Sequence, residues 1–291
     1  MNIKAIKNRA NELFQRCKPQ YTRILFLMLL IGLIPTIISL ILNNDLIDFI
    51  VTIVFITFSH GYIVSSLKIV RNNDISLRDD DAWVGFTRIK ELLPTYLLVD
   101  LFSYGMIIVV SLVLSFVLVA NSENIIYSLI NAINNSDVTS IIYILQSSTS
   151  FILSGILIIV IIAVISVVIS LYTYATPYLL EKYQMTNTKA IKESFKFIKG
   201  HVIDLLKLEL SFIGWMILAG VVTGLVGNVL SYILGTSLSS IVGTIVGGVV
   251  GIYTYLPQYY LSQAIFFEEI AYRRYSEQTQ DYFTQGETDV Y

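Results

Sequence analysis

Long apolar runs separated by short polar segments form the main pattern of this chain. A helix needs about 20 consecutive apolar residues to cross a hydrocarbon core of about 30 Å, and six segments approach or exceed that length. They cover residues 24–42, 46–70, 95–120, 151–180, 205–234 and 239–271. The pattern predicts an all-α polytopic membrane protein with six transmembrane helices.

The distribution of cations gives these spans a direction. All 19 Lys and Arg residues lie before the first span, around the connection of the second to the third or of the fourth to the fifth, or after the sixth. The stretch 121–150, which joins the third and fourth spans, contains no Lys or Arg. Because positively charged segments stay in the cytoplasm, we expect both termini on the cytoplasmic side.

Each polar segment that leads into an odd-numbered span has apolar residues at helical spacing. Spacings of three and four residues place side chains on one face of a helix, so three amphipathic interfacial helices are predicted. The apolar positions are Ile3, Ile6, Ala10, Leu13 and Cys17 in the first, Ala82, Phe86, Ile89 and Leu93 in the second, and Ile191, Phe195, Ile198 and Val202 in the third. The opposite face of the third helix is expected to contact anionic lipid headgroups through Lys189, Lys192, Lys196 and Lys199.

The three segments also share a short signature, in which Phe14, Phe86 and Phe195 are each followed four residues later by Lys. One interpretation is a threefold internal repeat, each unit an interfacial helix followed by a helical hairpin. The alternative is that any basic helix entering a membrane has this pattern. The units would cover about 1–70, 76–180 and 186–275 of one membrane domain (1–275), followed by a polar tail (276–291) that is expected to be disordered.

Three blocks of sequence resemble the DUF975 family of uncharacterised bacterial integral membrane proteins. They are AIKESFKFIKG at 190–200, LSFIGWMIL at 210–218 and the Pro-x-Tyr element at Pro257–Tyr259. The chain departs from the family where Gln258 separates that proline from the tyrosine. The resemblance implies a multi-pass protein of the bacterial cytoplasmic membrane, and it implies no particular activity.

Composition narrows the functional classes. Of the 291 residues, 55% are hydrophobic and 14% charged, whereas soluble domains carry about 25% charged residues. The net charge of −2 provides no basic field for nucleic acid, and one Cys with two His cannot form a disulfide or a Cys/His metal site. Hydrolase and phosphate-loop motifs are absent, so we expect a protein that is not an enzyme and has no cofactor.

Three ionisable residues inside the predicted spans are candidates for function, because such groups are costly in a bilayer. His60 lies within the second span and could carry protons or hold a polar substrate, or it could form a hydrogen bond to a neighbouring helix. Asp100 and Glu209 occupy similar places in the third and fifth spans. They could bind a cation together, or each could pair with a nearby Lys or Arg.

Prolines and tyrosines gather near the ends of the fourth and sixth spans. A proline interrupts the helical hydrogen-bond ladder, and such a break is tolerated where protein or a cavity surrounds it. These residues could therefore line a pocket that faces the cytoplasm, or they could form an aromatic belt at the headgroups. They are Tyr174, Pro177, Tyr178, Tyr255, Pro257 and Tyr259.

Glycines at four-residue spacing occur in the last two spans. Such spacing lets helix backbones approach closely in a membrane. The stripe could pack inside the chain or form the seam of a homodimer. The positions are Gly220, Gly224, Gly243, Gly247 and Gly251.

These features favour transport, or the handling of a lipid or small molecule, with the lipid bilayer as the main partner. The alternative is a non-catalytic scaffold or accessory subunit that binds another membrane protein. An intramembrane enzyme is the least favoured reading.

Overall fold

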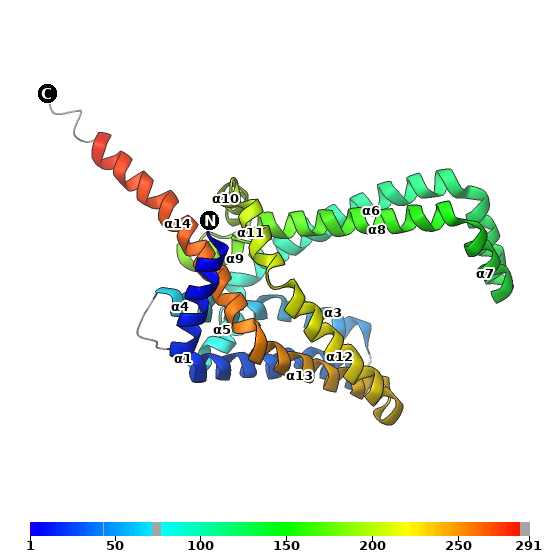
Figure 1. Ribbon diagram of the computed structural model, residues 1–291, viewed down its shortest axis with the longest axis horizontal. Coiled ribbons are helices and arrows are strands. Elements are labelled where there is room, and N and C mark those ends of the chain that lie inside the picture. The colour runs from blue at the N-terminus through cyan, green and yellow to red at the C-terminus, as the bar shows by residue number, and fades with distance from the viewer. Residues whose placement is uncertain (43, 72–76, 286–291) are drawn as a thin grey trace. The chain divides into compact units, whose positions relative to one another are not determined.

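The computed structural model describes residues 1–42, 44–71 and 77–285 (Figure 1). These residues form helices, turns and short connections, with no β-strand among them. The chain divides into two compact units. The first contains Met1–Leu97 and the chain from Tyr174 onward, and the second contains Leu98–Thr173.

The elements of the first unit are α1 (Ile3–Gly32), α2 (Ile34–Leu42), α3 (Asp45–Phe55), η1 (Ile56–Ser59), α4 (His60–Arg71), η2 (Asp79–Trp83), α5 (Val84–Thr87), α9 (Thr176–Tyr183), α10 (Asn187–Ile198), α11 (Val202–Leu210), α12 (Ile213–Leu234), α13 (Thr236–Thr254) and α14 (Leu256–Gln285). Helix α6 (Ile89–Asn134) begins in the first unit and continues into the second, which also holds α7 (Val138–Ser147) and α8 (Thr149–Thr173).

Length and composition identify the helices that can cross a membrane. Five stretches qualify, and a pair bent by 58° gives up to six if it forms one span. The prediction of long apolar helices is thus confirmed. The five are Ile3–Leu42, Asp45–Arg71, Ile89–Phe116, Ile152–Tyr183 and Ile213–Ile233, and the bent pair is Leu238–Thr254 with Leu256–Arg274.

The second predicted span is interrupted where η1 separates α3 from α4. Gly85 packs against this turn so closely that a Cβ atom there would lie 2.3 Å from the carbonyl oxygen of Thr57. The Thr57 hydroxyl donates a hydrogen bond of 2.8 Å to the Gly85 carbonyl. The segment that carries Gly85 was predicted to form one amphipathic helix, but it is divided among η2, the single turn α5 and the start of α6.

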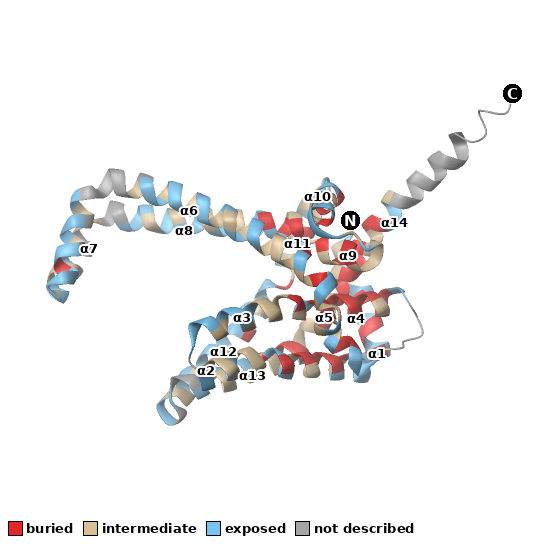
Figure 2. Cartoon of the chain, turned by 180° about the vertical axis from the view of Figure 1, so that it is seen from behind, coloured by how far each residue is buried: buried red, intermediate tan, exposed pale blue. Residues whose placement is uncertain are grey.

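The core of the first unit lies where α1, α4, α9 and the first half of α14 meet, and buried residues gather on these helices (Figure 2). Aromatic rings form a continuous stack in this core. The ring of Phe267 lies 4.9 Å from both Tyr178 and Phe197, measured between centroids. The stack therefore joins α14 to α9 and α10.

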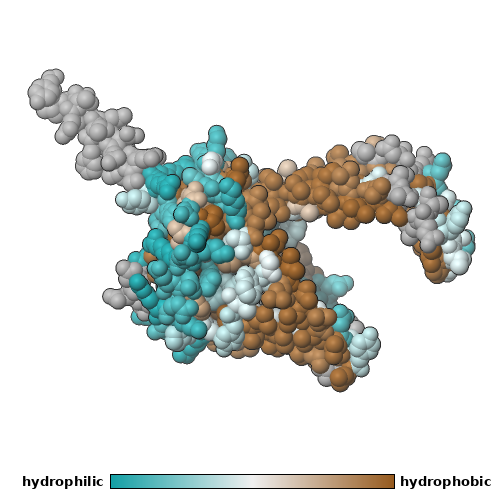
Figure 3. All heavy atoms as spheres, viewed as in Figure 1, coloured by the Kyte–Doolittle hydropathy of each residue, from teal (hydrophilic) through white to brown (hydrophobic). Residues whose placement is uncertain are grey.

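Helices α12 and α13 form a hairpin in which Gly243 and Gly247 of α13 pack closely against Thr223 of α12. A Cβ at Gly247 would lie 1.8 Å from the Thr223 hydroxyl, and one at Gly243 would lie 3.0 Å from the Thr223 carbonyl oxygen. A Cβ at Gly220 or Gly224 would meet nothing within 4 Å. The outer surface of the hairpin is apolar (Figure 3).

The second unit consists of apolar helices with little buried surface. Leu112 and Val160 are among its exposed large side chains, as expected for helices that face lipid. Asp137 precedes α7 and accepts hydrogen bonds from the Thr139 hydroxyl (2.6 Å) and the Ser140 backbone N–H (3.1 Å).

The final helix continues into the predicted tail. Helix α14 ends at Gln285, so the first ten residues of the segment predicted to be disordered are helical here. Residues 286–291 of that segment lie outside the described residues.

Candidate functional site

A buried polar network surrounds His60, whose side chain is fully buried at the start of α4. Its Nδ1 lies 2.9 Å from the Tyr96 hydroxyl and its Nε2 lies 3.0 Å from Glu181 Oε2. Arg88 donates a hydrogen bond of 2.6 Å to the same Glu181 oxygen. The network therefore ties together α4, the start of α6 and α9.

Arg88 is itself held from a second side. Its Nε and Nη2 donate to the two carboxylate oxygens of Glu91 at 3.0 and 2.7 Å, a bidentate geometry that is stronger than a single bond. These hydrogen bonds raise the pKa of the Arg88 guanidinium. The guanidinium thus stays charged and neutralises the carboxylate beside His60.

A second polar cluster forms around Glu209 on α11. The Tyr259 hydroxyl donates to its Oε2 at 2.9 Å, and Gln263 Nε2 donates to its Oε1 at 2.8 Å. The Tyr174 hydroxyl donates to the Gln263 backbone carbonyl at 2.5 Å. The structure thus brings together Glu209, Tyr259 and Tyr174 from three separate segments of the predicted set.

Tyr178 and the two prolines lie near this cluster. The ring centroids of Tyr174 and Tyr178 are 5.3 Å apart, and Pro177 lies in the first turn of α9. The break before α9 leaves the Ala175 N–H free of the helical ladder, and it donates to the Ser194 hydroxyl at 3.1 Å. Pro257 is buried in the first turn of α14, after the bend.

The side chains of the remaining predicted residues form no hydrogen bond with these two clusters in the described part of the chain. Tyr255 is the C-cap of α13 at the bend. Asp100 is partly exposed on α6 and belongs to the second unit, whereas Glu209 belongs to the first. The four lysines of the third predicted interfacial helix, Lys189, Lys192, Lys196 and Lys199, are all exposed.

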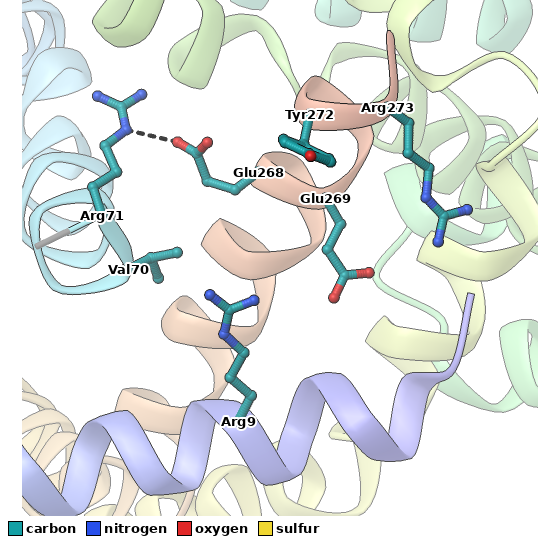
Figure 4. Close-up of a pocket in the computed structure, with 7 residues that line it drawn as sticks. All are labelled: Arg9, Val70, Arg71, Glu268, Glu269, Tyr272 and Arg273. Carbon is teal, nitrogen blue, oxygen red and sulfur yellow. Dashed lines mark hydrogen bonds and ion pairs between the residues drawn. The ribbon is translucent and has the colours of Figure 1, made fainter. Parts of the chain in front are cut away.

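A pocket of about 530 Å³ opens among α1, α4 and α14 (Figure 4). It is rich in charge, with arginines from all three helices and two consecutive glutamates from α14. An aliphatic and an aromatic side chain complete its wall. The lining residues are Arg9, Val70, Arg71, Glu268, Glu269, Tyr272 and Arg273.

The charges in this pocket are only partly neutralised by one another. Glu268 accepts hydrogen bonds from Arg71 (2.7 Å) and from Lys182 (2.5 Å). Within the part of the chain that the structure describes, neither Arg9 nor Glu269 forms an ion pair. The pocket therefore offers an unpaired guanidinium and an unpaired carboxylate.

Among the described residues, no three His, Cys, Asp or Glu side chains cluster in a way that could hold a metal ion.

Comparison of the chain with models of known protein families shows which family it belongs to. The model described as "Protein of unknown function (DUF975)" matches residues 1–274. The chain belongs to the DUF975 family. It matches no curated protein and no solved structure.

Sequence reasoning missed several polar residues of this DUF975 protein. The partners of His60, namely Tyr96, Glu181 and Arg88, were not singled out, and the arginines of the pocket were used only to orient the spans. The available signal was the pair Glu268 and Glu269 close to Arg273, which marks a charged site immediately after an apolar run.

Proposed function

We propose that this DUF975 protein resides in the bacterial cytoplasmic membrane and binds a phosphate-bearing lipid headgroup or small molecule at its cytoplasmic face. Binding would be a step in transport or in lipid handling, without catalysis of a chemical reaction. The observation that carries the proposal is the pocket among α1, α4 and α14, lined by Arg9, Arg71 and Arg273.

The chemistry of the lining supports a phosphate ligand. Arginine presents a planar fork of donors that matches phosphate oxygens in a bidentate geometry. Val70 and Tyr272 provide an apolar wall beside these donors, which suits a ligand with both a charged and an uncharged part. The volume of about 530 Å³ is in the usual range for a small-ligand site, about 300–1,000 Å³.

The membrane topology supports a cytoplasmic position. The positive-inside rule assigns the segments that carry Arg9, Arg71 and Arg273 to the cytoplasm. The exposed lysines of α10 would attract anionic lipid to the same surface, at about 1 kcal/mol for each basic residue near the membrane. In this proposal the fold consists of three helical hairpins, introduced by the first half of α1, by η2 with α5, and by α10.

Native mass spectrometry of protein released from nanodiscs of its own membrane lipids tests the proposal. We expect a phospholipid or a phosphorylated small molecule to remain bound. Arg9→Gln should lower the bound fraction by about tenfold, because a charge-assisted hydrogen bond contributes about 1.5–3 kcal/mol. Arg16→Gln is the matched control, since Arg16 is an exposed residue of the same helix that does not line this pocket.

Two results would contradict the proposal. One is a chain that carries no ligand, and the other is equal retention by the Arg9 variant and its control.

A scaffold or accessory subunit is the second candidate function. It is favoured by the face of α12 that carries Gly220 and Gly224, both exposed, where a Cβ atom would meet nothing within 4 Å. Small residues on a free helix face allow close approach of another membrane helix, from a second copy or from another protein. A stoichiometric protein partner in the same mass spectra, in place of a lipid, would favour this function.

A further inference from the structure

We propose that the pocket selects a ligand that carries both a phosphate group and a primary ammonium group, as in phosphoethanolamine. Arg9 would hold the phosphate and Glu269 the ammonium. This inference rests on the proposed function and adds the chemical class of the ligand.

The separation of Arg9 and Glu269 is the first argument. Both line the same pocket, and their charged groups point toward its interior from α1 and α14 (Figure 4). They do not pair with each other, and neither forms an ion pair with another described residue. A pocket that keeps opposite charges apart is complementary to a ligand with opposite charges at two positions.

The neutralisation of the neighbouring groups is the second argument. Glu268 is occupied by Arg71 and Lys182, and Arg273 has an interaction of its own. The charges left for a ligand are therefore those of Arg9 and Glu269. An anion without an amine would satisfy Arg9 but would meet the like charge of Glu269, and such unpaired or repulsive contacts are how sites reject the wrong ligand.

Two kinds of ligand carry both a phosphate and a primary ammonium group. One is the headgroup of phosphatidylethanolamine, and the other is a soluble phosphorylated amine. Val70 and Tyr272 line the pocket and could contact the glycerol part of a lipid or the methylene groups of a soluble ligand. The chemistry at Arg9 and Glu269 is the same for both.

The experiment compares nanodiscs that contain equal mole fractions of phosphatidylethanolamine or phosphatidylglycerol, followed by native mass spectrometry. We expect the ethanolamine lipid to be retained about tenfold more than the glycerol lipid. Glu269→Gln should abolish this preference while leaving phospholipid bound. Glu12→Gln, the same charge change at an exposed residue of α1 outside the lining set, should leave the preference unchanged.

Soluble ligands identify the source. Phosphoethanolamine and glycerol phosphate are added separately to protein in detergent, and bound mass is measured. Binding of phosphoethanolamine without any lipid preference would assign the site to a soluble ligand, and it should again depend on Glu269. Melting temperatures of both glutamate variants are measured alongside, so that misfolding is not mistaken for lost selectivity.

The outcomes separate this inference from the proposed function. If neither ligand source is preferred over its amine-free counterpart, or if the preference survives Glu269→Gln in folded protein, the inference is wrong. The proposed function still stands in that case as long as Arg9→Gln lowers retention of phosphate ligands. If no phosphate ligand binds at all, both are wrong.

Discussion

His60 shows how the partners of an ionisable residue decide its role. Both ring nitrogens are engaged, one with Tyr96 and the other with Glu181, and the side chain has no exposed surface. Of the two sequence interpretations, a hydrogen bond to neighbouring helices fits this geometry more directly than contact with a substrate. His60 is then a positioning residue that holds α4 against α9.

Removing His60 should therefore affect stability first. His60→Ala removes the hydrogen bonds that the ring makes with Tyr96 and Glu181 and creates a cavity, so we expect a loss of about 2–4 kcal/mol in the free energy of unfolding. Denaturation in detergent micelles measures this loss. His201→Ala, at a partly exposed histidine, should cost about 1 kcal/mol or less. Unchanged stability together with lost ligand binding would instead give His60 a direct role.

Asp137 gives a prediction about pH. Hydrogen bonds from Ser140 and Thr139 lower the pKa of this carboxyl group from 3.8 to about 2. Because the pKa is lowered in the folded state, the stabilisation of the start of α7 is complete above about pH 4 and is lost as the pH falls through 2. Amide hydrogen exchange at the start of α7 should therefore be protected at pH 5 and should lose protection near pH 2. In Asp137→Ala, protection at pH 5 should already be reduced, and a carboxyl that titrates near pH 4 would contradict the account.

The residues of the candidate sites were only partly predictable. Glu209, Tyr259 and Tyr174 were selected because polar and aromatic groups in apolar helices are unusual, and the structure brings them together. Arg9 gave no such signal, and Glu269 was marked only as part of the Glu268–Glu269 pair that follows an apolar run. Arg9 and Glu269 lie more than 250 residues apart in the sequence, and a local pattern contains no information on which distant charges meet or remain unpaired.

At the scale of elements, hydropathy predicted where the apolar helices lie but not where they break. The bend before α14 has a local cause, since Pro257 removes a backbone donor there. The turn η1 between α3 and α4 contains no proline or glycine, and it lies in close contact with Gly85 from a separate segment. A pattern of residue types therefore marks the bend at the proline but not the turn that packs against Gly85.

The α12–α13 hairpin offers a matched pair of glycine variants. Gly247→Val would drive a side chain into Thr223, and overpacking of this kind costs about 1–3 kcal/mol. Gly224→Val meets open space within the chain and should change the melting temperature little. Equal effects of the two substitutions on melting would contradict the packing described for this hairpin. A change of oligomeric state in the Gly224 variant would assign the open face to a second copy.

The whole molecule combines apolar helices with cations that the predicted topology places on one side of the membrane. This arrangement predicts that Asn135 faces the extracytoplasmic space and Lys192 the cytoplasm. In a Cys17→Ser background, Asn135→Cys should react with a membrane-impermeant maleimide in intact cells, whereas Lys192→Cys should react only after permeabilisation. The reverse pattern would invert the topology and place the arginine pocket outside the cell.

The central claim is that the pocket among α1, α4 and α14 holds a phosphate group. A cryo-electron microscopy map of the protein in nanodiscs of its own lipids tests it most directly. The account predicts headgroup density in this pocket, with a phosphate within hydrogen-bonding distance of the Arg9 guanidinium. A pocket without such density, in which Arg9 pairs with Glu269, would contradict it.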